Sequence, residues 1–162
     1  MRTNGSVLAI AAASALSLLA ASCGPDVEPC TTCINVQGTW SITMDSKSAA
    51  ASSCDQLYID GRTWEAELYQ TGSKLEMPRF FGSAGGFDGK LFADDSAQLG
   101  PKRVGVSNTS PVVYANLTLS GRFAGEEATR QFSGLLLVHA TFDGTICTLS
   151  TPVRMTRKAT AP

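Results

Sequence analysis

Apolar residues at every second position are the feature that most constrains this chain. Two stretches show the pattern best, with apolar sets Val113, Ala115, Leu117, Leu119 and Phe123, and Phe132, Leu136, Val138, Ala140 and Phe142. A period of two places the apolar side chains on one face of a β-strand. Because no stretch after residue 22 keeps the 3.6-residue period of a helix, we predict an all-β domain.

Shorter stretches with the same period indicate further strands, at residues 40–44, 64–68, 74–77 and 86–92. A last strand is expected from Thr145 to about Arg157, after the hairpin signal Asp143-Gly144. Gly100-Pro101 interrupts residues 96–111, where we expect only a short strand near Val104. The result is about eight antiparallel strands, each next to its sequence neighbour. Closure into a small up-and-down barrel would remove the two open edges of this meander.

The run Leu135-Leu136-Leu137-Val138 departs from this pattern because it is apolar on both faces. A strand of a simple barrel is apolar on its inner face only. We therefore expect the Ser/Ala-rich loop 46–53 or a partner to cover the outer face. The alternative is that these leucines are simply exposed, which is common.

The first 22 residues form a leader with one charge, Arg2, and an apolar core. The core ends in Leu18-Leu19-Ala20-Ala21-Ser22-Cys23, which resembles the lipobox of bacterial lipoproteins. The resemblance implies cleavage before Cys23 and acylation of Cys23 with fatty acids such as palmitate. Two or more acyl chains anchor a protein stably to a membrane. The alternatives are a secretory leader cleaved near Ala21 and an uncleaved anchor helix.

The leader suggests how the chain is divided. We predict a signal peptide at residues 1–22, a lipid-anchored tether at 23–35, a barrel domain at 36–158 and a tail at 159–162. The resemblance places the protein in the bacterial cell envelope. Gly24 follows the cysteine, where lipoproteins retained in the inner membrane usually carry aspartate, so the outer membrane is implied in a Gram-negative cell.

Charge and composition exclude several functions. The chain has 162 residues, with 13 basic, 14 acidic and one histidine, and the 140 that follow residue 22 carry a formal charge of −2. This size suits one domain. The near-neutral balance argues against nucleic acid as a partner, because no basic surface is available to replace counterions. One histidine weakens acid–base catalysis and most metal sites, so we predict a non-enzymatic protein without cofactor or metal.

Charged pairs and clusters elsewhere have ordinary interpretations. Asp94-Asp95 and Glu126-Glu127 lie in predicted turns, where neighbouring side chains point apart, and we interpret them as solvated. Arg154, Arg157 and Lys158 form a basic cluster that we expect at a solvated strand end.

Gly38-Thr39-Trp40 on the first strand, together with a basic residue on the last strand, resembles the lipocalin and avidin-like barrels. In those families a Gly-x-Trp closes the bottom of the barrel, and an arginine lies across the indole. The resemblance implies that Gly38, Trp40 and either Arg154 or Arg157 close the barrel here. These residues would be structural and would not contact a ligand.

Four cysteines remain after Cys23: Cys30, Cys33, Cys54 and Cys147. An even number in an exported domain predicts two disulfides. We prefer Cys54–Cys147, which closes a long loop, with Cys30–Cys33 as a local bond. The rival pairs Cys30 or Cys33 with Cys54 or Cys147. A redox-active pair or a four-cysteine zinc site is disfavoured, because Cys30-x-x-Cys33 follows a Pro-rich segment and the other two cysteines are far apart in sequence.

Two functions remain open. In the first, the barrel binds a small apolar ligand in a cavity lined by Phe87, Leu91, Leu117 and Leu136. In the second, the barrel is solid and an outer face, such as that of Leu135 and Leu137, meets another envelope protein. The two hypotheses differ in one observable feature, which is whether the interior is hollow or packed.

Overall fold

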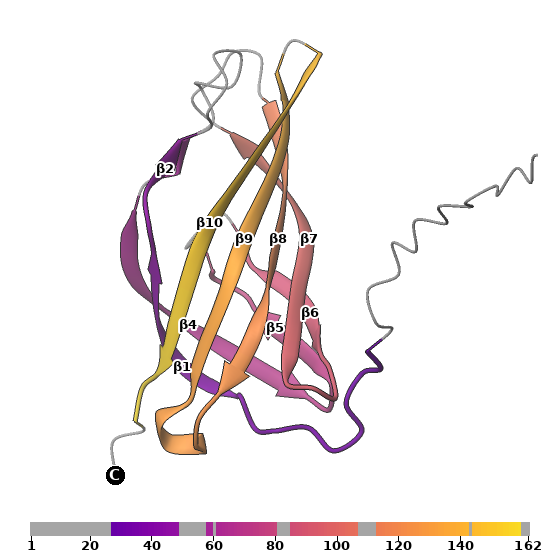
Figure 1. Cartoon of the computed structure of the whole chain (residues 1–162), viewed down its shortest axis with the longest axis vertical. Coiled ribbons are helices and arrows are strands. Elements are labelled where there is room, and N and C mark those ends of the chain that lie inside the picture. Colours follow the sequence, from indigo (N-terminus) through magenta and orange to yellow (C-terminus); the bar gives the residue numbers. More distant parts are fainter. Residues whose placement is uncertain are drawn as a thin grey trace, which may run out of the picture.

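The structure, a computed structural model, describes residues 27–48, 58–59, 61–80, 85–106, 113–142 and 144–159. Eight antiparallel strands close into a barrel in the order β1-β10-β9-β8-β7-β6-β5-β4 (Figure 1). The barrel strands are β1 Gly38–Met44, β4 Arg62–Thr71, β5 Lys74–Met77, β6 Phe87–Leu91, β7 Ser96–Val106, β8 Val113–Ala124, β9 Gln131–Phe142 and β10 Thr145–Arg157. The predicted all-β fold and the closed meander of eight strands are confirmed.

Two short elements complete the described chain. β2 (Lys47–Ser48) and β3 (Tyr58–Ile59) pair with each other between β1 and β4, and the 3-10 turn η3 (Glu127–Thr129) connects β8 to β9. The end of the barrel that carries η3 is called the closed end here, and the end that carries the β9–β10 turn is the far end (Figure 1). In the described residues, no helix has the length and apolar character needed to cross a membrane.

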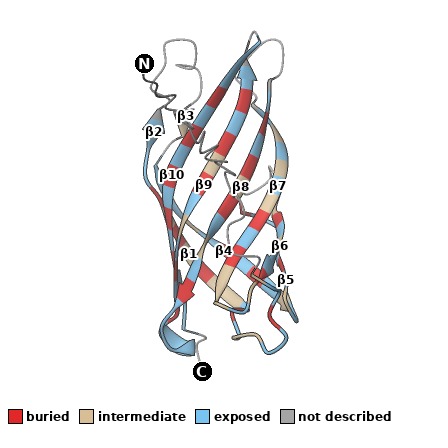
Figure 2. Cartoon of the chain, turned by 45° about the vertical axis from the view of Figure 1, so that its right-hand side comes forward, coloured by how far each residue is buried: buried red, intermediate tan, exposed pale blue. Residues whose placement is uncertain are grey.

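Burial follows the predicted alternation along the strands (Figure 2). In β10 every second residue from Cys147 to Met155 is buried, and the residues between them are exposed. Buried side chains from all eight barrel strands make one hydrophobic core inside the barrel. The alternating apolar residues of each strand therefore form the interior of the barrel.

The segment 96–106 differs from the expectation of a short strand near Val104. β7 runs through Gly100-Pro101 as one strand of 11 residues, and its pairing with β8 shifts register between Leu99 and Lys102. A β-bulge tolerates a proline because the extra residue does not need to donate to the ladder. The two breakers therefore mark an irregularity within the strand and do not end it.

The N-terminal segment, expected to be a tether up to residue 35, already contacts the barrel at Glu28 and Pro29. Residues 27–37 cross the closed end of the barrel (Figure 1). Pro29 forms a bridge with Phe92, the Cys30 amide donates to the Leu91 carbonyl, and Val36 is fully buried. An open barrel end exposes core side chains and backbone groups, so a segment that covers it is stabilised by packing and hydrogen bonding.

The outer face of β9 carries the expected apolar residues. Leu135 is 51% exposed and Leu137 is half-buried, and the neighbours of Leu135 in the sheet are Ser120 and Pro152. The predicted cover is not provided to Leu135 by the described residues, and residues 49–53 of the proposed covering loop lie outside them. Leu135 is thus an exposed leucine that shares the outer face of β9 with the half-buried Leu137.

Two glycines let the long strands β8 and β9 pack against an aromatic ring. Gly121 and Gly134 lie opposite each other in the sheet, on the inner face. A Cβ at Gly134 would lie 2.4 Å from the Ser120 carbonyl oxygen and 2.7 Å from the ring of Phe132. Real Cβ atoms do not approach so closely, so this position requires glycine.

We predict that Gly134→Ala lowers the free energy of unfolding by about 1–3 kcal/mol, because backbone and Phe132 must both move. The measurement is equilibrium denaturation followed by tryptophan fluorescence. Ser133→Ala is the matched control, since Ser133 is exposed, and it should change stability by less than about 0.5 kcal/mol. An unchanged stability in Gly134→Ala would contradict the close packing described here.

Candidate functional site

Arg157 holds the closed end of the barrel. It lies opposite Trp40 in the β1–β10 pairing, and its guanidinium donates to the carbonyls of Gln37, Glu127 (3.1 Å) and Asn35 (3.4 Å). The planar fork of arginine can serve several acceptors in this way, whereas lysine cannot. Arg157 therefore ties the N-terminal segment to the β8–β9 connection and to the last strand.

Gly38 leaves the space that Arg157 occupies. Its φ of +144° is one that other residues rarely adopt, and a Cβ there would lie 3.2 Å from the Arg157 Nε atom. Trp40 is fully buried two residues later, and its indole N–H donates to the Val36 carbonyl at 3.0 Å. Gly38, Trp40 and Arg157 thus meet at one end of the barrel.

Arg154 has no part in this closure. It lies on the opposite, outer face of β10, its side chain is 69% exposed, and its nearest acid, Asp45, is 4.0 Å away. The period of two explains the difference: Val153, Met155 and Arg157 share the inner face. Of the two arginines considered from the sequence, only Arg157 can reach the barrel end.

Hydrogen bonds replace the expected stacking of an arginine on the indole. Cation–π contacts in the described part of the chain lie elsewhere, with Arg62 at 4.7 Å from the Trp64 ring and Arg103 at 4.2 Å from the Tyr114 ring. Trp40 packs instead against Phe123, with ring centroids 5.4 Å apart.

Three further residues at the closed end were missed by the sequence analysis. Arg130 is 8% exposed and donates to the Asn35 carbonyl at 2.5 Å. Gln70 accepts from the Val36 amide at 2.8 Å and donates to the Ile34 carbonyl at 2.9 Å. Glu127, interpreted as solvated, accepts from the Asn35 side chain at 2.5 Å. No periodic signal marks these residues, because each acts through one or two hydrogen bonds with the N-terminal segment.

Large side chains fill the interior above the closed end. The rings of Trp40, Phe123 and Phe132 form one contact chain, with successive centroids 5.4 and 5.0 Å apart. Further along the barrel, Phe80 from the β5–β6 connection is fully buried between Trp64 and Phe87, at 5.3 and 5.0 Å. The indole N–H of Trp64 is buried and has no hydrogen-bond partner.

The four residues predicted to line a ligand cavity all lie inside the barrel. Phe87, Leu91, Leu117 and Leu136 are between 0 and 6% exposed. None of them lines either of the two hollows found among the described residues. The structure thus places these side chains in the core and both hollows on the outside of the barrel.

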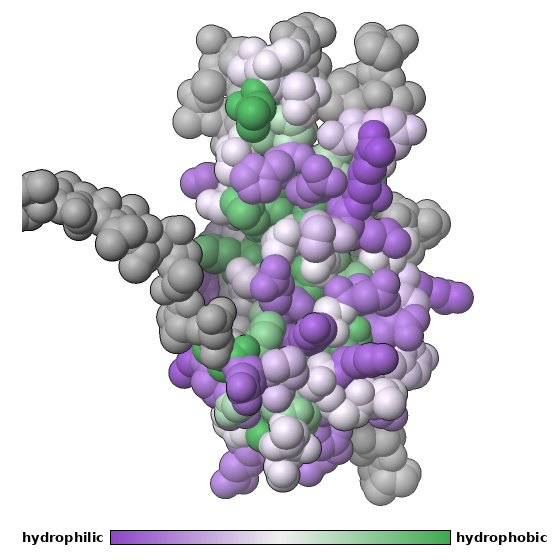
Figure 3. All heavy atoms as spheres, turned by 90° about the vertical axis from the view of Figure 1, so that its right-hand side faces the viewer, coloured by the Kyte–Doolittle hydropathy of each residue, from purple (hydrophilic) through white to green (hydrophobic). Residues whose placement is uncertain are grey.

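The larger hollow, called the outer groove here, has a volume of about 860 Å³ and crosses the outer face of β4, β5, β6 and β7. Its lining includes the exposed side chains of Tyr69, Lys74, Glu76, Asp88, Lys90 and Gln98, together with Thr71, Phe92 and Gly100. Figure 3 looks onto this side of the molecule, where hydrophilic side chains cover much of the described surface. A second hollow of about 540 Å³ lies on the outer side of β4, next to Pro78 and Arg79.

Like charges lie side by side in the outer groove. In the β5–β6 pairing Lys74 is opposite Lys90, and Glu76 is opposite Asp88. Within the described chain none of these four side chains has an ion-pair partner within 4.0 Å. The groove therefore presents a row of two positive charges beside a row of two negative charges.

Another acid, Asp94, already has hydrogen-bond and ion-pair partners within the barrel. Asp94, in the β6–β7 turn, accepts from the Ser96 amide and hydroxyl and pairs with Arg122 at 2.5 Å. The hydrogen bonds from Ser96, and the charge of Arg122, lower the pKa of Asp94 below its usual value. Asp94 is therefore a turn-stabilising residue.

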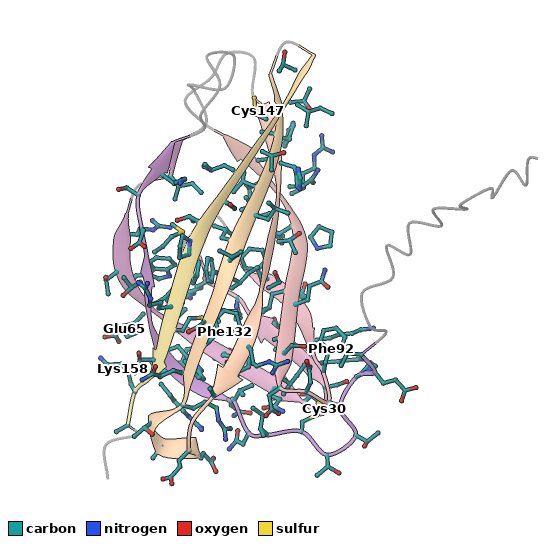
Figure 4. The ribbon with its side chains drawn as sticks, viewed as in Figure 1. Cys30, Glu65, Phe92, Phe132, Cys147 and Lys158 are labelled. Carbon is teal, nitrogen blue, oxygen red and sulfur yellow. A yellow bond between two sulfur atoms is a disulfide. The ribbon has the colours of Figure 1, made fainter. Side chains whose placement is uncertain are left out.

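The cysteines lie at opposite ends of the barrel (Figure 4). Cys30 and Cys33 form a disulfide at the closed end, with Cα atoms 5.2 Å apart, which confirms the predicted local bond and excludes the rival pairing. Cys147, near the far end, is 1% exposed and is also disulfide-bonded. Cys54 and Cys23 lie outside the described residues, so the Cys54–Cys147 pair stays a prediction.

Histidine, cysteine, aspartate and glutamate side chains do not gather in groups of three or more anywhere in the described ranges. The chain matches no protein-family model, and searches of the curated proteins and of the solved structures found no match. The closed antiparallel barrel of eight strands is consistent with a lipocalin-like fold.

We predict that Arg157→Lys lowers the free energy of unfolding by about 1–3 kcal/mol, because the compact ammonium group of lysine cannot reproduce the forked hydrogen bonds to Asn35, Gln37 and Glu127. Hydrogen exchange of the Val36 and Gln37 amides should become faster, since the segment is no longer held. Denaturation and exchange measured by NMR check both effects.

Arg154→Lys is the matched control on the same strand, and it should change stability by less than about 0.5 kcal/mol. Equal losses in the two variants, or unchanged exchange at residues 36 and 37 in Arg157→Lys, would show that the closed end does not depend on Arg157.

Proposed function

We propose that this protein is a lipid-anchored envelope lipoprotein whose solid barrel carries its binding surface on the outside. The observation that carries this proposal is the contrast between interior and exterior. The interior next to the closed end is filled by aromatic rings in tilted contact, whereas a groove of about 860 Å³ lies on the outer face of β4–β7. A barrel of this kind acts as a rigid scaffold for another molecule.

The packed interior favours this function over binding of an apolar ligand within the barrel. An eight-stranded barrel has an interior that is just wide enough for side chains to fill it. Here the largest fully buried side chains come from opposite walls and include Trp40, Phe87, Phe123 and Phe132. An apolar ligand in this space would have to displace them.

The lipid anchor rests on the sequence of the leader. The run that ends in Cys23 has the order of charge, apolar core and small residues that lipoprotein leaders share. The described domain begins soon afterwards, because Glu28 and Pro29 already contact the barrel. An anchor at Cys23 would therefore hold the closed end near the membrane.

We expect no saturable binding when the protein is titrated with the apolar fluorophore 1-aminoanthracene. Leu136→Ala should lower the free energy of unfolding by about 2–5 kcal/mol, because it leaves a cavity in a packed interior. Leu135→Ala is the matched control on the outer face and should have little effect. Stoichiometric binding of the fluorophore, displaced by a fatty acid, would instead support a ligand inside the barrel.

We also expect the N-terminal peptide of the native protein to carry an acylated Cys23, as read by mass spectrometry of the membrane fraction. In the Cys23→Ser variant the acylated N-terminal peptide should be absent. Recovery of an unmodified Cys23, or of a peptide that still contains the leader, would contradict the anchor.

A further inference from the structure

The charge rows of the outer groove are not explained by stability. Like charges directly opposite each other on neighbouring strands destabilise a sheet. Exchanging Asp88 and Lys90 would place an acid opposite Lys74 and a lysine opposite Glu76, which would give two favourable pairs in the same positions. The observed order instead keeps two positive and two negative charges together, and each row is available to a ligand.

The two rows together suit a ligand that carries both signs of charge. Residues two apart on a strand are separated by about 7 Å, so the lysine row and the acid row are one such step apart. Thr71 and Gln98 flank the lysine row as neutral donors, and Tyr69, 48% exposed, flanks the acid row. An aromatic ring beside carboxylates is a favourable site for an ammonium group. The net charge of the four side chains is zero, which favours a zwitterion over a simple anion or cation.

The position of the groove indicates where such a ligand comes from. Phe92 lines the groove, and its backbone bridges to Pro29. Six peptide steps separate Pro29 from Cys23, a distance of at most roughly 20 Å for an extended chain. The lysine row adjoins the β4–β5 and β6–β7 turns at the closed end, so it is nearer than the acid row to Glu28 and Cys30, which bond to residues 93 and 91. In a phospholipid the phosphate likewise lies deeper in the membrane than the ammonium group.

We propose that the outer groove binds the zwitterionic headgroup of a phospholipid, with the phosphate on Lys74 and Lys90 and the ammonium group on Glu76, Asp88 and Tyr69. This inference rests on the proposed anchor at Cys23, which brings the groove to the membrane surface. The headgroup would orient the barrel on the membrane that the acyl chains attach it to.

The test uses the proposed mature chain, residues 23–162, with Cys23→Ser, so that neither the apolar leader nor acylation contributes to vesicle binding. Flotation should occur with vesicles of phosphatidylethanolamine and phosphatidylcholine, and much less with vesicles of phosphatidylglycerol, which lacks the ammonium group. Lys90→Gln and Asp88→Asn should each weaken flotation by about tenfold or more, because each removes a charge-assisted contact. The melting temperature of both variants should stay the same or rise, since each loses a like-charge neighbour.

Lys47→Gln and Glu126→Gln are the matched controls, because both residues are exposed and lie outside the groove. Both should float like the parent chain. If Lys90→Gln and Asp88→Asn float as well as the parent chain, or if the parent chain prefers phosphatidylglycerol, the inference is overturned. Calorimetric binding of glycerophosphoethanolamine without flotation would identify a free zwitterion and overturn the membrane source.

A second copy of the chain is the remaining occupant that the test can reveal. Concentration-dependent dimerisation that Lys90→Gln abolishes, in the absence of vesicle binding, would assign the groove to self-association and overturn the inference. Acylation of Cys23 is measured separately by mass spectrometry. A modified Cys23 with unaltered flotation of the groove variants would therefore refute the headgroup site and leave the proposed anchor intact.

Discussion

The volume inside an eight-stranded barrel is the constraint on which the rest of this structure depends. Such an interior can be filled by the side chains of its own strands, and here Trp40, Phe123 and Phe132 fill its lower part. The ring of Phe132 fits into this interior only because Gly121 and Gly134, which lie beneath it, have no side chains. The proposal of a binding surface on the outside of the barrel follows from this packing.

The strand pattern of the fold was predictable from the sequence. Each strand buries one face, so apolar residues occur at every second position. The same period could have separated Arg157 from Arg154, since Val153 and Met155 already mark the inner face of β10. The bulge at Gly100-Pro101 was not predictable in this way. Proline always lacks a backbone N–H donor. Only the pairing with the neighbouring strand shows whether a hydrogen bond is needed at that position.

The attachment of the N-terminal segment and the outer groove could not be predicted from the sequence, for a different reason. Residues 27–37 have no periodicity, and their attachment depends on hydrogen bonds with Gln70, Arg130 and Arg157, which are distant in sequence. The charge rows appear only when the register of β5 and β6 is known. A shift of that pairing by two residues would give a different arrangement of the same lysines and acids.

The way the N-terminal segment crosses the barrel end has a mechanical consequence for an anchored chain. A pull transmitted from the membrane would reach the hydrogen bond between Glu28 and Ala93 first, and then the one between Cys30 and Leu91. The Cys30–Cys33 disulfide links the chain across the two residues between them, so this segment can lengthen little under tension. The tension would next act on the hydrogen bonds that Arg130 and Arg157 donate to the Asn35 carbonyl. Tension would thus be absorbed stepwise at the rim, before any strand of the barrel is strained.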